Sequence, residues 1–230
     1  MAAGGRYELY SNYPFIFRRL LLASVRRCET NSVYQSLQKS SRQSIFQIPE
    51  YGLVMELKSQ DLLVLFKRIA NPEQSWTYAA LGGVLGLSAS QVHRSVQRAT
   101  DAGLAASKGR GDWEVIPEAL TEFAVHGVRY AFPAKIGVIR RGIPTSFGTS
   151  PLSEQISAAP GEAPIWPYAE GEVRGPSLTP LHEYVPEAAL ADRALYELLA
   201  LLDAIRTGRS RERTLAQKLL TERLGLPRAA

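Results

Sequence analysis

Residues 77–115 have the sequence TYAALGGVLGLSASQVHRSVQRATDAGLAASKGRGDWEV, and this stretch decides the fold. Thr77 is a good N-cap for a short helix over residues 78–85, because its hydroxyl can accept a hydrogen bond from a free backbone N–H group. Gly86 supplies the left-handed residue that ends this helix. A second helix over residues 89–102 follows at once, so the pattern predicts two helices joined by a tight turn.

The second helix and the segment after it have clear limits. Ser88 is the N-cap candidate of this helix, and Gly103 stops it. Residues 104–106 can begin a strand, and residues 113–115 can return as its partner. The turn between them, residues 107–112, has the sequence SKGRGD, with two glycines and two basic residues. A short β-hairpin is therefore expected directly after the helix.

The second helix has two unlike faces. Its apolar residues Val92, Val96 and Ala99 share one side, which we expect to pack on the preceding helices. Its polar residues lie away from that side, where arginine can pair with guanine and glutamine with adenine. The helix N-terminus suits a phosphate, and the basic turn of the hairpin suits the DNA backbone or the minor groove. The candidate DNA-binding residues are Ser88, Ser90, Gln91, Arg94, Ser95, Gln97, Arg98, Lys108 and Arg110.

The phrase LGLSASQVHRSVQRATDAGL and the glycine-containing hairpin resemble the winged helix-turn-helix transcriptional regulators, of the broad MarR-like or GntR-like kind. The resemblance covers about residues 59–115. It implies a mainly α fold with a small β-hairpin, with helix 89–102 in the major groove and wing 107–112 on the backbone. It also implies that a homodimer binds double-stranded DNA in a sequence-specific manner. A repressor of its own operon, of the antitoxin type, is one kind of regulator that fits this layout.

The charge distribution keeps a second interpretation open. The formal net charge is +5, but residues 1–54 hold 7 basic and 3 acidic residues and so contribute +4 of it. Residues 55–115 hold 7 basic and 6 acidic residues, a net charge of +1. Winged helices also serve as protein–protein adaptors that never contact DNA, and the near-neutral charge favours that alternative. DNA affinity would then depend on where the few local cations lie.

The beginning of the chain does not resemble a domain. Residues 1–54 show no sustained periodicity of apolar residues. They are poor in acidic residues, which is also typical of an organelle transit peptide. Met55 opens the first ordered helical periodicity, so our hypothesis is that it is the native start and that the leader is an over-extended gene model, disordered in either case. Residues 59–70 are predicted to form the first helix of a 55–132 winged helix-turn-helix domain. Its apolar stripe is Leu62, Leu65, Phe66 and Ile69.

The rest of the chain is predicted to fall into two parts. A helix over residues 117–132, with Pro117 at its first position, leads into an extended Pro/Gly-rich arm over residues 133–185. Within the arm, AKIGVIRRGIPTSFG and PIWPYAEGEVRG each suggest a docked strand-and-turn unit, and the basic residues Lys135, Arg140 and Arg141 are expected to extend the DNA-binding surface.

Residues 186–230 are predicted to form a helical hairpin for dimerisation or partner binding, with Gly208 as the stop after its first helix. Its leucine-rich stripe is expected to pack on the arm or on a second protomer. A toxin protein or a small effector are the partners we expect for residues 133–230. The stripe consists of Leu195, Leu198, Leu199, Leu202 and Ile205.

Several function classes are not expected. The single cysteine, Cys28, excludes an intramolecular disulfide framework and favours a reducing cytoplasm. His93, His126 and His182 have no ligand-like spacing, so neither a metal nor another cofactor is expected. The sequence has no phosphate-binding glycine loop, nucleophile elbow or interpretable carboxylate pair, which argues against an enzyme. We find no apolar stretch long enough to span a bilayer.

Overall fold

The described part of the chain is mainly helical, about 54%, with a two-stranded and a three-stranded sheet. The expected leader, residues 1–54, and the hairpin residue Arg110 lie outside the described residues, as does Pro227 beyond the last helix. All described residues belong to one compact unit, Met55–Ala230. The computed structural model describes residues 56–109, 111–157, 159 and 161–225.

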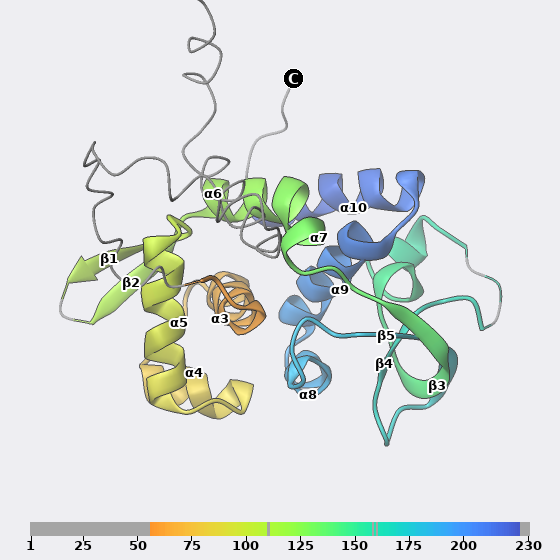
Figure 1. Cartoon of the computed structure of the whole chain (residues 1–230), viewed down its shortest axis with the longest axis horizontal. Helices are drawn as coiled ribbons and strands as arrows, with labels where there is room; N and C mark the ends of the chain where they lie inside the picture. Colours follow the sequence, from red (N-terminus) through yellow and green to blue (C-terminus); the bar gives the residue numbers. More distant parts are fainter. Residues whose placement is uncertain (1–55, 110, 158, 160, 226–230) are drawn as a thin grey trace, which may run out of the picture. The chain divides into compact units, whose positions relative to one another are not determined.

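Three helices and a β-hairpin come first, and local capping sets their limits (Figure 1). The hydroxyl of Thr77 accepts a hydrogen bond from the backbone N–H of Ala80, and Gly86 has φ +70°. Ser88 caps the next helix. The predicted limits of all three helices are confirmed to within a residue. The elements are α3 (Ser59–Ala70), α4 (Tyr78–Leu85), α5 (Ala89–Asp101), β1 (Ala105–Gly109) and β2 (Asp112–Val115).

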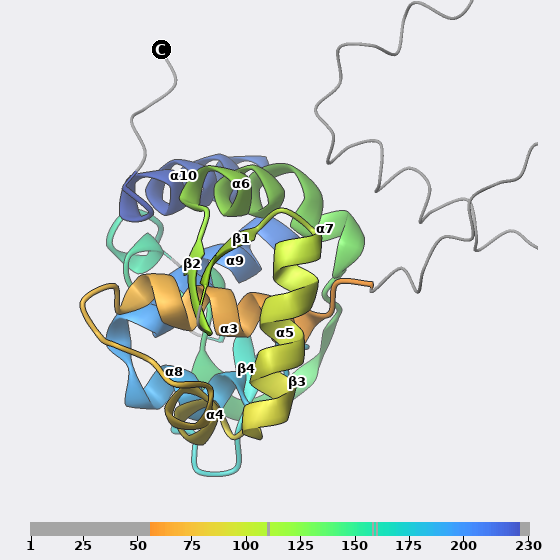
Figure 2. The same cartoon turned by 90° about the vertical axis from the view of Figure 1, so that its left-hand side faces the viewer.

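Helix α3 lies at the centre of this group, with α5 and the hairpin on one side of it and the C-terminal helices on the other (Figures 1 and 2). It packs on α5, β2 and α9, a C-terminal helix described below. The five consecutive residues Leu62–Phe66 are all 0% exposed. The predicted amphipathic stripe therefore understates the burial of α3, because neighbours far along the chain cover its other faces.

The segment after the hairpin is one continuous helical run. It consists of α6 (Pro117–Glu122), the π-helical turn η3 (Phe123–Gly127) and α7 (Val128–Ala131). Pro117 occupies its first turn, as predicted. The predicted buried face is confirmed, and its members are Leu120, Phe123, Ala124 and Val128.

The expected extended arm forms a small sheet instead. Strand β3 (Ile136–Pro144) pairs in antiparallel fashion with both β4 (Ile165–Pro167) and β5 (Val173–Leu178). Strands β4 and β5 meet in parallel through Ile165 and Ser177, which closes the three strands on one another. The two predicted strand-and-turn units thus become partners of each other, a pairing between distant segments that no local pattern indicates.

Three helices end the described chain: α8 (Val185–Ala191), α9 (Arg193–Thr207) and α10 (Ser210–Arg223). The helical hairpin of α9 and α10 is confirmed, but the single helix predicted before the turn is broken at Asp192. The carboxylate of Asp192 accepts a hydrogen bond from the N–H of Leu195 and so caps α9. The helix stop predicted at Gly208 is confirmed, because α9 ends at Thr207 and Gly208 is its C-cap, with an extended backbone at φ −61°. Glycine is needed there for space, since a Cβ would lie 2.3 Å from the carbonyl oxygen of Ala204.

Helix α9 is the central helix of the C-terminal half. It packs against α3, α7, α8, α10 and the 3-10 turn η4 (Ser146–Gly148). Its predicted leucine stripe is buried within the same chain, so the stripe is not free for the dimer contact that the sequence suggested. The stripe residues Leu195, Leu198, Leu199, Leu202 and Ile205 are each at most 5% exposed.

A buried carboxylate joins α9 to the sheet. Asp203 is 1% exposed and accepts hydrogen bonds from Trp166 Nε1 at 2.5 Å and Thr145 Oγ1 at 3.1 Å. It also forms an ion pair with Arg206, whose Nε donates to the carbonyl oxygen of Phe132. Burial raises the pKa of Asp203, while the charge of Arg206 and these hydrogen bonds oppose that rise. One carboxylate thereby connects β4, the end of β3, α7 and α9.

A second carboxylate joins the two halves. Lys67 of α3 forms a 2.6 Å ion pair with Asp192, and both side chains are about one-tenth exposed. Asn71 Nδ2 donates to the same carboxylate oxygen at 2.7 Å. Burial alone raises the pKa of Asp192, but the hydrogen bonds from Lys67, Asn71 and the Leu195 N–H outweigh it, so the net pKa is lowered.

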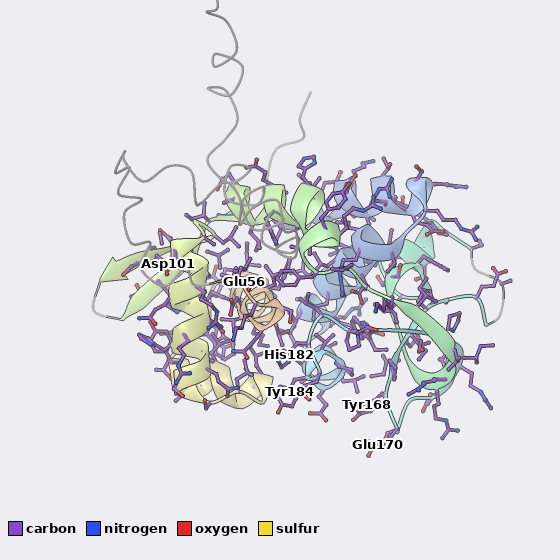
Figure 3. The ribbon with its side chains drawn as sticks, in the orientation of Figure 1. Glu56, Asp101, Tyr168, Glu170, His182 and Tyr184 are labelled. Atoms are coloured by element: carbon purple, nitrogen blue, oxygen red, sulfur yellow. The ribbon has the colours of Figure 1, made fainter. Side chains whose placement is uncertain are left out.

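The start of α8 also packs against the end of α4. A Cβ at Gly86 would lie 3.2 Å from the ring of Tyr184, so glycine allows this close approach. The ring of His182 lies 5.2 Å from that of Tyr184 (Figure 3), and burial lowers the pKa of this histidine.

The Asp203 network predicts a large cost for its removal. Asp203→Ala leaves the buried Arg206 without a counter-charge, so the free energy of unfolding should fall by about 3–5 kcal/mol. Trp166→Phe removes one hydrogen bond and keeps most of the ring, so it should cost about 1–3 kcal/mol. Urea unfolding of both variants measures this difference. Equal losses in the two variants would contradict the central role of the carboxylate.

The lowered pKa of Asp192 predicts an acid-dependent contribution to stability. The contribution is present above the ordinary pKa of 3.8 and is lost as the pH falls through the folded-state value. The stability difference between wild type and Asp192→Asn should therefore stay constant between about pH 7 and about pH 5 and shrink below about pH 4. Urea titrations across this range measure it, with the exposed Glu187→Gln on α8 as the control.

Candidate nucleic-acid interface

Helix α5 presents one polar row to solvent. Ser90, Arg94, Gln97 and Asp101 are all exposed. Their spacing of three or four residues puts them on one face of the helix. The opposite face packs inward through Val92, Val96 and Ala99, each at most 5% exposed. The predicted exposure of Ser90, Arg94 and Gln97 is confirmed, and α5 lies beside the hairpin at one end of the unit (Figure 2).

Two of the predicted contact residues do not belong to this row. Arg98 is 7% exposed and makes a bidentate ion pair with Asp61 of α3, with Nε 2.8 Å from Oδ2. The hydrogen bond to Asp61 raises the pKa of Arg98. Ser95 is 0% exposed and accepts hydrogen bonds from Gln60 Nε2 and Arg98 Nη2. The prediction that Arg98 points to solvent is wrong, because a wholly buried carboxylate on α3 needs its charge.

The N-terminus of α5 is closed by a reciprocal capping box. Ser88 Oγ accepts from the N–H of Gln91 at 3.2 Å, and Gln91 Oε1 accepts from the N–H of Ser88 at 2.8 Å. Ser90 Oγ lies 3.1 Å from Ser88 Oγ. The amide oxygen of Gln91 is therefore engaged, which leaves only its Nε2 for a base and removes the predicted bidentate pairing with adenine. The first turn still presents backbone N–H groups that suit a phosphate.

The hairpin supplies one described cation. Lys108 of β1 forms a 2.7 Å ion pair with Glu114 of β2, and each side chain is about half exposed. The hydrogen bond that Lys108 donates to Glu114 raises the pKa of Lys108. Trp113, 4% exposed, anchors the hairpin to the core. Because exposed ion pairs contribute little free energy, Lys108 can exchange Glu114 for a phosphate at small cost.

A groove of about 400 Å³ runs between α5 and the hairpin. The ring of His93 packs edge-on against that of Tyr78 at 5.2 Å. Asp101 lies at the hairpin end of α5 (Figure 3). The sequence interpretation missed His93 and Asp101, although their spacing of four residues from Gln97 places them on the same side. The residues that line the groove include Tyr78, His93, Gln97, Asp101, Asp112 and Trp113.

The cations predicted to extend the DNA-binding surface lie elsewhere. Arg140 and Arg141 belong to β3, which lies at the opposite end of the unit from α5 and the hairpin (Figures 1 and 2). Lys135 directly precedes the same strand. The structure therefore does not bring these residues together with α5 and the hairpin.

Comparisons of the chain with protein-family models, with curated proteins and with solved structures gave no match. Among the described residues, no group of three or more His, Cys, Asp or Glu side chains is placed to hold a metal ion. No described helix has both the length and the apolar composition needed to cross a membrane. The geometry of the site therefore carries the functional argument alone.

The two arginines of α5 should respond differently to substitution. Arg98→Ala leaves Asp61 buried without its cation, so the free energy of unfolding should fall by about 3–5 kcal/mol. Arg94→Ala removes an exposed side chain and should change stability by less than about 0.5 kcal/mol. Chemical denaturation of the two variants side by side provides the test. A silent Arg98→Ala substitution would refute the buried pair.

Proposed function

We propose that α3, α4, α5 and the β1–β2 hairpin form a winged helix-turn-helix that binds double-stranded DNA in a sequence-specific manner, as a transcriptional regulator. The observation that carries the proposal is the exposed row of Ser90, Arg94 and Gln97 on a helix whose other face is buried. An α-helix of this kind fits the major groove, where side chains contact base edges.

Each part of the surface has a distinct role in the proposal. Arg94 reads guanine through its two-pronged guanidinium group, and Gln97 reads adenine through its amide. The N-terminus of α5, with Ser88 and Ser90, holds a backbone phosphate. Lys108 at the hairpin contacts a neighbouring phosphate after it leaves Glu114. Arg98 holds α5 on α3 and contacts no base.

The local charges limit the affinity of one protomer. Among the described residues of this surface, the cations Arg94 and Lys108 are accompanied by the acidic residues Asp101, Asp112 and Glu114, and Lys108 is paired with Glu114. Because phosphate contacts supply most of the salt-dependent affinity, we propose that a dimer binds an inverted repeat and doubles these contacts. A repressor of its own operon, of the antitoxin type, is the form of regulator that we favour.

The alternative function is a protein–protein adaptor built on the same helices. It is favoured by the two carboxylates in the groove beside α5, Asp101 and Asp112, which repel a phosphate backbone. An adaptor would use the groove and the half-buried ring of Tyr78 to hold a partner side chain, and it would not bind duplex DNA at low salt.

Selection of duplexes from a random library with the full chain, followed by fluorescence anisotropy, separates the two functions. Arg94→Ala should weaken binding to the selected site by about 1–3 kcal/mol and relax the preference at one base pair. Lys108→Ala should weaken binding to all sequences equally and reduce the salt slope by about one. Lys218→Ala, an exposed change on α10, is the control.

Failure to select any duplex, even at low salt, would refute DNA binding and support the adaptor. Retained base preference in the Arg94→Ala variant would refute the assignment of α5 as the helix that contacts the bases.

A further inference from the structure

The outer edge of β3 is exposed and apolar. Ile136, Val138 and Ile139 are 59%, 69% and 64% exposed, which is unusual for three large aliphatic residues within four positions. All of residues 136–141 are exposed. This segment is predicted from the sequence to be a docked strand-and-turn unit whose arginines extend the DNA-binding surface, but the proposed DNA surface does not include it.

One side of this strand has no partner among the described segments. Strand β5 pairs with β3 through Ile136 and through residues 139–142. Strand β4 pairs only with residues 142–144, and the N–H of Tyr168 closes the edge by donating to the carbonyl oxygen of Arg141. The backbone of residues 136–140 therefore has a free edge about five residues long, with an irregularity in the β3–β5 register between Ile136 and Ile139.

Three cations lie on this part of the sheet, two on β3 and one on its partner β5. Arg140, Arg141 and Arg174 are exposed, and Arg141 is directly opposite Arg174 in the β3–β5 register. Like charges in directly opposed positions destabilise a sheet. None of the three has an ion pair with any described residue. Glu170 and Glu172 lie in the segment that joins β4 to β5, so the three arginines leave the sheet with a small net positive charge that an acidic ligand would neutralise.

We propose that the free edge of β3, residues 136–140, binds an extended acidic and aliphatic segment of a partner protein and adds it to the sheet as a strand. Backbone hydrogen bonds to the edge provide the docking, as in other strand-addition complexes. Aliphatic side chains of the partner cover Ile136 and Ile139, and its carboxylates pair with the arginines. This surface is at the far end from α5, so the inference does not depend on DNA binding.

Charge complementarity selects this occupant over segments of the chain itself. Residues 1–54 hold 7 basic and 3 acidic residues, and residues 226–230 hold one arginine and no acid. Both segments have the same sign as the surface. A second copy would bring the same arginines to the edge, where they would repel.

Two other anionic ligands fit the surface less well. A nucleic acid could pair its phosphates with the arginines. It has no extended peptide backbone to bond to the strand edge and no aliphatic side chains to cover Ile136 and Ile139. A membrane would leave the N–H and C=O groups of the open edge without hydrogen bonds in the lipid, which is costly. Because side chains alternate along a strand, Ile139 and Arg141 project from the same face. Insertion of Ile139 into a lipid bilayer would therefore carry the charged Arg141 towards the bilayer as well.

Hydrogen bonds to a buried carboxylate fix the C-terminal end of β3 and the neighbouring strand β4. Thr145, directly after β3, donates to the buried Asp203 of α9, and Trp166 of β4 donates to the same carboxylate. Tyr168 and Glu170 belong to the turn that joins β4 to β5 (Figure 3). Pairing with β5 holds the edge in an extended form before any ligand binds, which lowers the entropic cost of docking.

A synthetic peptide of four Val-Glu repeats, with blocked ends and a fluorescent label, tests the proposal with the full chain. Anisotropy should show binding that weakens with salt, and a Val-Lys peptide of the same length should bind at least about tenfold more weakly. The double variant Arg140→Glu with Arg141→Glu should lose about tenfold or more in affinity for the Val-Glu peptide, because two attractive charges become repulsive. Arg211→Glu with Lys218→Glu, exposed on α10, is the matched control and should bind as wild type does.

Hydrogen exchange on the wild-type chain distinguishes strand addition from loose charge attraction. Saturating Val-Glu peptide should slow amide exchange within residues 136–140. This measurement also keeps the proposal testable if the double variant fails to fold.

Several results would overturn the proposal. They include equal affinity for the Val-Glu and Val-Lys peptides, no binding of the Val-Glu peptide at about 1 mM, unchanged amide exchange, and unchanged affinity in a folded double variant. A concentration-dependent dimer that the double variant abolishes would assign the edge to a second copy. Binding of phosphatidylserine vesicles that the double variant abolishes would assign it to lipid.

Discussion

The carboxylate of Asp61 is wholly buried between α3 and α5, and the position of the exposed helix depends on how it is neutralised. Arg98 approaches it with two nitrogen atoms, and Ser95 and Gln60 complete the hydrogen bonds around them. This pair orients α5 on α3. With Arg98 held inside, Arg94 and Gln97 point outward. The ion pair therefore decides which side chains α5 offers to a ligand.

Two further carboxylates extend the same principle through the rest of the unit. Asp192 caps α9 and binds Lys67 of α3, so it ties the N-terminal helices to the C-terminal ones. Asp203 receives hydrogen bonds from the small sheet and pairs with Arg206. A buried carboxylate is costly without its donors, so each one specifies the arrangement of the segments that supply them.

The unit has two exposed surfaces of different character at opposite ends (Figure 1). The α5 surface is polar and nearly neutral, with Arg94 as its exposed cation and with carboxylates in the adjacent groove. The β3 edge is aliphatic and basic, with an open backbone. Ligands of different chemistry suit the two ends, and they can be bound at the same time because the central helices α3 and α9 separate them.

The sequence by itself determined the features that depend on neighbours a few residues apart. Thr77, Gly86 and Ser88 set the limits of α4 and α5 through capping bonds that span three or four residues. The hairpin and the helix at Pro117 follow from equally local signals. About half of the candidate site, the exposed row of α5, could be predicted in this way, because helical periodicity alone orients those side chains.

Only the tertiary structure decided the features that depend on distant partners. Arg98 has the same helical pattern as an exposed arginine, and nothing nearby in the sequence indicates Asp61, 37 residues away. The pairing of β3 with β4 and β5, and the burial of α9 within its own chain, also join segments far apart. The periodicity of apolar residues predicts which side chains must be buried. It does not predict which helix or strand buries them, because that depends on packing and charge between segments far apart in the sequence.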